Sequence, residues 1–242
     1  GRQGNERYAA PMKRPSDLFD LTRLDPALRE LVDQPRPWDV LAAMDRHLKA
    51  LPHEVIVEEG ATVHPTAILE GAVTVRVGAT IEAHAHVRGP ALIEAGANIG
   101  HAALVRDGCI LAAGAKVGHA SEAKRSLLLP GAKAPHFNYV GDAILGIDVN
   151  LGAGVKIANL KNDGSTIHVG TVDTHLRKFG AALGDDVHVG CNAVLGPGAV
   201  IGARTLIYAG ATVRGAIPAD HIVKHRAVGE IVERLPGGPP GT

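Results

Sequence analysis

A period of six residues governs the middle of this chain. Every sixth position from Val57 to Val117 is Val, Ile or Leu, eleven residues in all. The position four residues after each of these is small, or at most Val, and the period returns from Leu183 to Val213. An amphipathic helix repeats every 3.6 residues and a half-buried strand every two, so neither produces a strict period of six.

Repeats of six residues are typical of parallel β-helices, in which the large aliphatic residue points inward and the small one fits the turn. The pattern resembles the hexapeptide-repeat acyltransferases. That resemblance implies an all-β, left-handed parallel β-helix of triangular section, with three hexads in each coil. We expect about seven coils and a prism on the order of 35 Å long. A right-handed solenoid or another all-β repeat is the alternative.

Composition narrows the class of protein further. Lys and Arg number 25, as do Asp and Glu, and this balance argues against a nucleic-acid-binding protein. Aromatic residues make up only 3% of the chain, so the core must be aliphatic. Cys109 and Cys191 lie far apart, which argues against a disulfide framework or a zinc site. We find no membrane span and no signal peptide, so we expect a cytoplasmic protein.

The pattern divides the chain into four parts. Residues 1–15 have no apolar period and are expected to be disordered or a remnant of expression. Residues 16–54 are predicted to be helical, with one helix starting at Asp25-Pro26 and a second from about Trp38 to Leu51. We expect this segment to cap the open end of the β-helix. The β-helix should span 55–226, with a projecting loop at 160–182 that contains the hairpin signal Asn162-Asp163-Gly164, followed by a tail at 227–242.

Several segments at non-repeat positions carry a narrower resemblance. They are "EAKRS", "APHFNYVGDAILG", "VNLGAGVKIAN", "GDDVHVGCN" and "IYAGATVRGAIPADHIVKHR". They resemble the acetyltransferase domain of the bacterial bifunctional enzyme that makes UDP-N-acetylglucosamine, and the related archaeal sugar-phosphate nucleotidyl/acetyltransferases. The nucleotidyltransferase half of those enzymes has no counterpart here. The resemblance implies acetyl-CoA as cosubstrate, no tightly bound cofactor, and a homotrimer with sites between neighbouring prisms.

Arg106 and Lys124 are separated by three full hexads, so they should stack one coil above the other. Two adjacent cations on a chain of zero net charge suit a bound phosphate, because Arg offers a planar fork and Lys a point charge. Two solvated surface residues are the alternative. The resemblance places the phosphate of the substrate at this pair.

His136 is the candidate general base. Acetylation of a sugar amine needs the neutral amine, and a histidine, whose ordinary pKa is about 6.5, can accept its proton at neutral pH. The resemblance gives His136 this role and makes Tyr139, Asn150 and Asn159 substrate contacts. A structural histidine, and asparagines that stack in ladders or occupy corners, are the alternatives.

The resemblance also assigns residues to the cosubstrate and to the subunit contact. The Ala153 N–H faces the acetyl carbonyl, where a donor would stabilise the oxyanion. Cys191 stands where the bacterial enzyme has a serine, and no base is evident that would make it a nucleophile. The resemblance places Ala209 in the wall of the cofactor site and Lys224 with Arg226 at its basic end. It assigns Lys178 to the site of a neighbouring subunit.

The leading function is an acetyl-CoA-dependent N-acetyltransferase of an amino-sugar phosphate, with glucosamine 1-phosphate as the best candidate. Such a reaction belongs to nucleotide-sugar or cell-envelope biosynthesis. A nucleotide-linked amino sugar or a longer acyl donor would keep the fold and change the substrate. A non-catalytic trimeric scaffold for a separate sugar nucleotidyltransferase is a different class. A metal site like that of the γ-class carbonic anhydrases would use histidines such as His101 and His119, which should stack. The pair His84 and His86 is similarly ambiguous.

Overall fold

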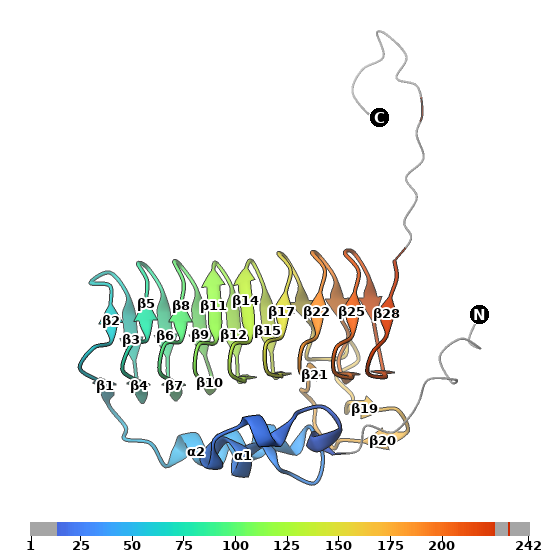
Figure 1. Ribbon diagram of the computed structural model, residues 1–242, viewed down its shortest axis with the longest axis horizontal. Coiled ribbons are helices and arrows are strands. Elements are labelled where there is room, and N and C mark those ends of the chain that lie inside the picture. The colour runs from blue at the N-terminus through green and yellow to red at the C-terminus, as the bar shows by residue number, and fades with distance from the viewer. Residues whose placement is uncertain (1–13, 226–231, 233–242) are drawn as a thin grey trace.

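The computed structural model describes residues 14–225 and residue 232. The chain folds as the predicted left-handed parallel β-helix, whose three faces are sheets of nine, nine and eight strands (Figure 1). Each strand pairs in parallel with the strand one coil away. There are thus about nine coils rather than the seven expected, and the prism is about 43 Å long. In the described part of the chain, neither helix is long and apolar enough to cross a membrane.

The three faces are named sheets A, B and C. Sheet A contains β1 (Val55–Val57), β4 (Val73–Val75), β7 (Ala91–Ile93), β10 (Cys109–Leu111), β13 (Leu127–Leu128), β16 (Ile144–Leu145), β21 (Ala181–Leu183), β24 (Ala199–Ile201) and β27 (Ala216–Ile217). Sheet B contains β2 (Thr62–Val63), β5 (Thr80–Ile81), β8 (Asn98–Ile99), β11 (Lys116–His119), β14 (Lys133–His136), β17 (Asn150–Leu151), β22 (His188–Val189), β25 (Leu206–Ile207) and β28 (Ile222–Val223). Sheet C contains β3 (Ile68–Glu70), β6 (His86–Arg88), β9 (Leu104–Arg106), β12 (Glu122–Lys124), β15 (Tyr139–Gly141), β18 (Lys156–Ile157), β23 (Val194–Leu195) and β26 (Thr212–Val213).

The hexad residues fill the interior as expected. Val75, Ile93, Leu111 and Leu128 lie one above another inside the prism and are completely buried, with small residues such as Ala115 at the turns. Coil length varies near the centre, however. Arg106 pairs with Lys124, three full hexads further along the chain, whereas the partner of Ile110 is Leu127, one position short of three hexads. The next coil is shortened in the same way, since Leu127 pairs with Ile144, and these two coils are the reason that the period falters in the sequence.

The N-terminal segment is helical, but it does not cap the end of the prism. Two 3-10 turns, η2 (Pro15–Asp17) and η3 (Leu21–Arg23), precede α1 (Pro26–Val32) and α2 (Asp39–Lys49). Asp25 caps α1 as predicted, because its carboxylate accepts from the N–H groups of Ala27 and Leu28. Both helices lie along the outside of sheet A (Figure 1).

The location of the helices follows from outward-facing apolar residues of sheet A. Leu92, Ile110, Leu127 and Ile144 point away from the prism and form a second core with the helical segment. Burying this stripe removes its apolar surface from water, which favours packing of the helical segment on sheet A. The first coil therefore stays open, and Val55, Val57 and Ile68 are exposed.

The loop predicted to project at 160–182 instead folds back over the same second core. Ile167 and Phe179 are completely buried there, and the Phe179 ring lies 6.4 Å from the ring of Trp38. The loop contains one hairpin of β19 (His168–Val169) and β20 (Val172–Asp173). The hairpin turn is at Gly170-Thr171, not at Asn162-Asp163-Gly164, which forms a separate turn closed by the Gly164 N–H and the Lys161 carbonyl.

Candidate active site

His136 ends β14 at the corner between sheets B and C, with an exposed side chain. The backbone at this corner is fixed by one side chain, Asn138, which is 3% exposed. The Asn138 Oδ1 accepts from the His136 N–H at 3.0 Å, and its Nδ2 donates to the Gly152 carbonyl at 2.8 Å. The irregular coil is thus rigidly held, and it presents the imidazole of His136 to solvent.

On the N-terminal side of His136 the same corner carries a column of aromatic rings, which ends at the neighbouring residue Phe137. His101 and His119 stack as predicted, with ring centroids 5.4 Å apart and planes 19° from parallel. His84 and Phe137 extend the column by edge-on contacts at 5.4 and 5.2 Å. Within the described residues no group of three or more His, Cys, Asp or Glu could hold a metal ion.

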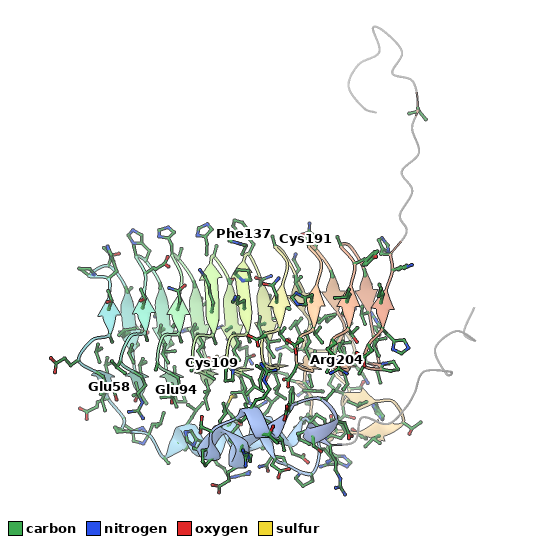
Figure 2. The ribbon with its side chains drawn as sticks, in the orientation of Figure 1. Glu58, Glu94, Cys109, Phe137, Cys191 and Arg204 are labelled. Atoms are coloured by element: carbon green, nitrogen blue, oxygen red, sulfur yellow. The ribbon has the colours of Figure 1, made fainter. Side chains whose placement is uncertain are left out.

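Downstream of His136 the corner is lined by small residues. Successive backbone hydrogen bonds run from Gly154 N–H to the His136 carbonyl, from Asn192 N–H to the Ala153 carbonyl, and from Gly210 N–H to the Cys191 carbonyl. Ala153, Cys191 and Ala209 therefore follow one another on consecutive coils. Phe137 and Cys191 lie on the edge of the prism that faces away from the helices (Figure 2). The Ala153 N–H makes no backbone hydrogen bond to any described residue.

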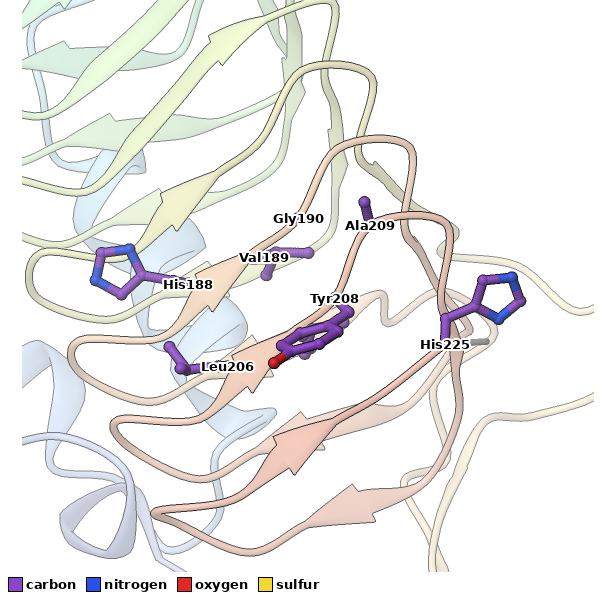
Figure 3. Close-up of a pocket in the computed structure, with 8 residues that line it drawn as sticks. His188, Val189, Gly190, Leu206, Tyr208, Ala209 and His225 are labelled. Atoms are coloured by element: carbon purple, nitrogen blue, oxygen red, sulfur yellow. The ribbon is translucent and has the colours of Figure 1, made fainter. Parts of the chain in front are cut away.

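A pocket of about 510 Å³ opens at the far end of this track (Figure 3). Ala209 lies in its wall, together with His188, Tyr208 and His225. Lys224 is exposed beside it. Arg226 lies outside the described residues. Tyr208 was not singled out from the sequence, although a tyrosine is a visible signal in a chain that has only three.

Arg106 and Lys124 stack as predicted, but neither is a free cation. Arg106 forms ion pairs with Glu122 at 2.7 Å and with Asp107 at 2.5 Å. Lys124 is 9% exposed and forms an ion pair with the buried carboxylate of Asp142 at 3.0 Å. Carboxylates of the same and the next coil therefore neutralise both charges.

Tyr139 and Asn159 meet in a shallow pocket of about 430 Å³ next to these ion pairs, with Glu122 on its edge. The two side chains are hydrogen-bonded and lie over Gly141, where a Cβ atom would come within 2.9 Å of both. Burial, helped by the charges of Glu122 and Asp142, raises the pKa of the Tyr139 phenol. The phenol thus stays protonated at neutral pH. Glu122 was not predicted as a site residue, because the sequence did not show that it pairs with Arg106.

Two predicted substrate residues lie apart from this pocket within one chain. Asn150 is on sheet B, between Lys133 and His188 of the neighbouring coils, whereas Tyr139 and Asn159 line a pocket beside sheet C. Lys178 is exposed on the loop, next to the buried Phe179. Within one chain, therefore, Asn150 does not line the pocket of Tyr139 and Asn159.

The two cysteines should differ sharply in reactivity. Burial raises the pKa of the Cys109 thiol to about 12, whereas Cys191 is exposed on the corner track. Only the thiolate is nucleophilic, so iodoacetamide at pH 8 should alkylate Cys191 alone in the folded protein and both cysteines in urea. Mass spectrometry of the peptides measures this. Rapid labelling of Cys109 before unfolding would contradict the packing of sheet A.

Comparison with known proteins agrees with the repeat architecture. Residues 180–215 match the bacterial transferase hexapeptide family (six repeats). The bifunctional sugar-1-phosphate nucleotidylyltransferase/acetyltransferase of Sulfurisphaera tokodaii is 43% identical over 96 residues, 38% of this chain and 24% of the relative. The bifunctional protein GlmU of Methanococcus aeolicus is 35% identical over 191 residues, 78% of this chain and 46% of the relative.

Solved structures also resemble the chain, at low identity. A UDP-N-acetylglucosamine acyltransferase of Francisella novicida has a TM-score of 0.38 at 14% identity, over 67% of this chain and 62% of its own. The acetyltransferase domain of PglB from Neisseria gonorrhoeae, in complex with acetyl coenzyme A, has a TM-score of 0.24 at 15% identity, over 82% and 68%. The chain spans less than half the length of the two bifunctional relatives. It is a hexapeptide-repeat protein, homologous to one part of the bifunctional sugar-1-phosphate nucleotidylyltransferase/acetyltransferases.

Proposed function

We propose that this chain is an acetyl-CoA-dependent N-acetyltransferase of an amino-sugar phosphate, with glucosamine 1-phosphate as the first candidate. One observation carries the proposal: His136 stands at the head of the track formed by Ala153, Cys191 and Ala209. Three coils at roughly 4.8 Å each make a path of about 14 Å without bulky side chains. Such a path suits the narrow pantetheine arm of coenzyme A, and the pocket with Tyr208 and His225 suits its nucleotide end.

The geometry supports one sequence of steps. The amine nitrogen attacks the acetyl carbonyl while His136 accepts an amine proton. The N–H of Ala153, which lies one coil below His136, donates to the oxyanion of the tetrahedral intermediate. The C–S bond then breaks, the amide is formed, and coenzyme A leaves as the thiol after taking a proton from His136. Tyr139 and Asn159 contact the sugar.

The phosphate of the acceptor is assigned to Arg106 and Lys124. Each cation holds a carboxylate in the structure, so the phosphate would bind by displacing or sharing Glu122 and Asp107 on Arg106. Arg106 remains partly exposed and can make this exchange, whereas Lys124 is nearly buried. We also propose a homotrimer, in which Asn150 or Lys178 of one subunit completes the site of another. A separate nucleotidyltransferase could then use the product.

The test is coenzyme A release from acetyl-CoA with glucosamine 1-phosphate, together with the mass of the acetylated product. The variant Ala209→Leu should raise the KM for acetyl-CoA by at least about tenfold, because added methylenes block the track. Ala113→Leu is a matched control, since it lies in the same Ala-Gly-Ala turn sequence on a different corner. It should leave this KM unchanged.

Each other outcome has a defined meaning. Binding of acetyl-CoA without turnover of glucosamine 1-phosphate would reject this acceptor and direct the search to nucleotide-linked amino sugars. An equal rise of the KM for acetyl-CoA in both leucine variants would show that the track does not bind the cosubstrate. A protein that binds no coenzyme A would be the trimeric scaffold rather than an enzyme.

A further inference from the structure

A network of ion pairs joins the N-terminal helical segment to the substrate pocket. Its centre is Asp142, whose side chain is 1% exposed. The Lys124 Nζ donates to Asp142 Oδ2 at 3.0 Å, and the Arg125 Nη1 donates to Oδ1 at 3.2 Å. Asn159 also donates its Nδ2 to Oδ2. One buried carboxylate thus orients both the amine of Lys124 and the amide of Asn159.

Arg125 is held from the other side by a residue of α2. Its Nη2 donates to Asp45 Oδ2 at 2.7 Å, and its Nε donates to Asp45 Oδ1 at 3.3 Å. Two parallel contacts of this kind fix the plane of a guanidinium group. Arg125 therefore bridges a carboxylate of the helical segment and a carboxylate that sets the pocket.

The backbone at this corner brings the two side chains together. Arg125 and Asp142 occupy equivalent corner positions of consecutive coils, and both have left-handed backbones, with φ of 44° and 45°. This conformation recurs at other corners of the prism, for example at Ala120 with φ of 48°. The Gly180 N–H also donates to the Asp142 carbonyl.

We propose that Asp45 is a positioning residue for the acceptor site, acting through Arg125 and Asp142 on Lys124 and Asn159. The proposal rests on the function proposed above. With Asp45 present, the guanidinium is shared between two carboxylates, which leaves Asp142 Oδ2 to Lys124 and Asn159. Without Asp45, the guanidinium moves onto Asp142 and competes for that carboxylate, so the amine and the amide lose their orientation.

The chain contains a matched control for this proposal. Arg23 also joins the helical segment to the prism, through ion pairs with Asp148 at 2.9 Å and Asp186 at 3.7 Å. No residue of that cluster lines the substrate pocket. Arg23→Ala therefore removes a comparable link between helices and prism while the network around Asp142 stays intact.

The experiment compares Asp45→Ala, Asp45→Glu and Arg23→Ala with the wild-type full chain. Asp45→Ala should raise the KM for glucosamine 1-phosphate about tenfold, with a smaller effect on kcat and on the KM for acetyl-CoA. Asp45→Glu should restore most of the loss, and Arg23→Ala should have wild-type kinetics. The midpoints of thermal unfolding of the two alanine variants should be similar. Wild-type kinetics in Asp45→Ala, or an equal loss in Arg23→Ala, would overturn the proposal.

A second readout separates this proposal from the proposed reaction. The N-hydroxysuccinimide ester of acetic acid acylates accessible amines, and peptide mass spectrometry compares Lys124 with the exposed Lys133 in the same sample. The reagent should label Lys124 several-fold faster in Asp45→Ala than in the wild type or in Arg23→Ala. If wild-type protein fails to acetylate any amino-sugar phosphate but this labelling pattern holds, the reaction is wrong and the network stands. Unchanged labelling of Lys124 rejects the network whatever the activity.

Discussion

The variant His136→Ala is expected to lower kcat for acetylation of glucosamine 1-phosphate by at least about 100-fold, because positioned general bases contribute 10²–10⁴-fold. That loss corresponds to about 2.7 kcal/mol of transition-state stabilisation. Binding of acetyl-CoA should be unchanged, since the imidazole lies at the head of the track and outside the pocket of Tyr208 and His225 that we propose for coenzyme A. Steady-state kinetics and calorimetric titration with acetyl-CoA measure the two quantities separately.

His119→Ala provides the control for this variant. His119 pairs with His136 across adjacent coils, is also exposed, and belongs to the column of rings at the same corner. It stacks on His101, and its Nδ1 lies 3.1 Å from the His101 carbonyl, so contacts within the column hold its imidazole. Its replacement should leave kcat within about threefold of wild type. Equal losses in the two variants would assign the effect to the column, and full activity in His136→Ala would require another base.

The prism was predictable because every coil needs the same residue types at the same positions of its hexads. An inward aliphatic and a small corner residue recur whatever the chain does outside. The helix start was predictable for a similar reason, since Asp25-Pro26 is a local signal that needs no distant partner. The predicted place of the helices, at the open end of the prism, was wrong, although the sequence carried a signal for sheet A. Strands of sheet A such as "ALI", "CIL" and "LLL" carry a second, outward-facing apolar residue.

The site was predictable only in part. Stacking of Arg106 on Lys124 followed from their separation of three hexads, and the structure confirms it. The carboxylates that neutralise them were not predicted. Asp142 is also three hexads beyond Lys124, but the coil there is one residue shorter, so Gly141 pairs with Lys124 and Asp142 lies at the following corner. From that corner the side chain of Asp142 points back to Lys124, a strand residue of the preceding coil. Asp45 could not be placed at all without knowing that α2 lies on sheet A.

Phe179→Ala should be among the most destabilising single changes in the loop at 160–182. The ring is completely buried between the loop, Trp38 and the outer face of sheet A. Replacing a buried Phe by Ala costs about 3–5 kcal/mol, through lost burial and the cavity that remains. The midpoint of urea unfolding should fall accordingly, and Val172→Ala, at a hairpin position that is 46% exposed, should change stability by no more than about 0.5 kcal/mol.

The same variant tests whether the loop and the pocket form one unit. The Phe179 N–H donates to the Asn159 carbonyl, and the Gly180 N–H to the Asp142 carbonyl, so the anchored loop holds the backbone of two residues that set the pocket. Loss of the ring should therefore also raise the KM for the acceptor in the protein that remains folded. A loop that projected freely would give a loss of stability below about 1 kcal/mol, and that result would contradict the second core. A large loss of stability with an unchanged KM would show that the loop stabilises the prism without organising the site.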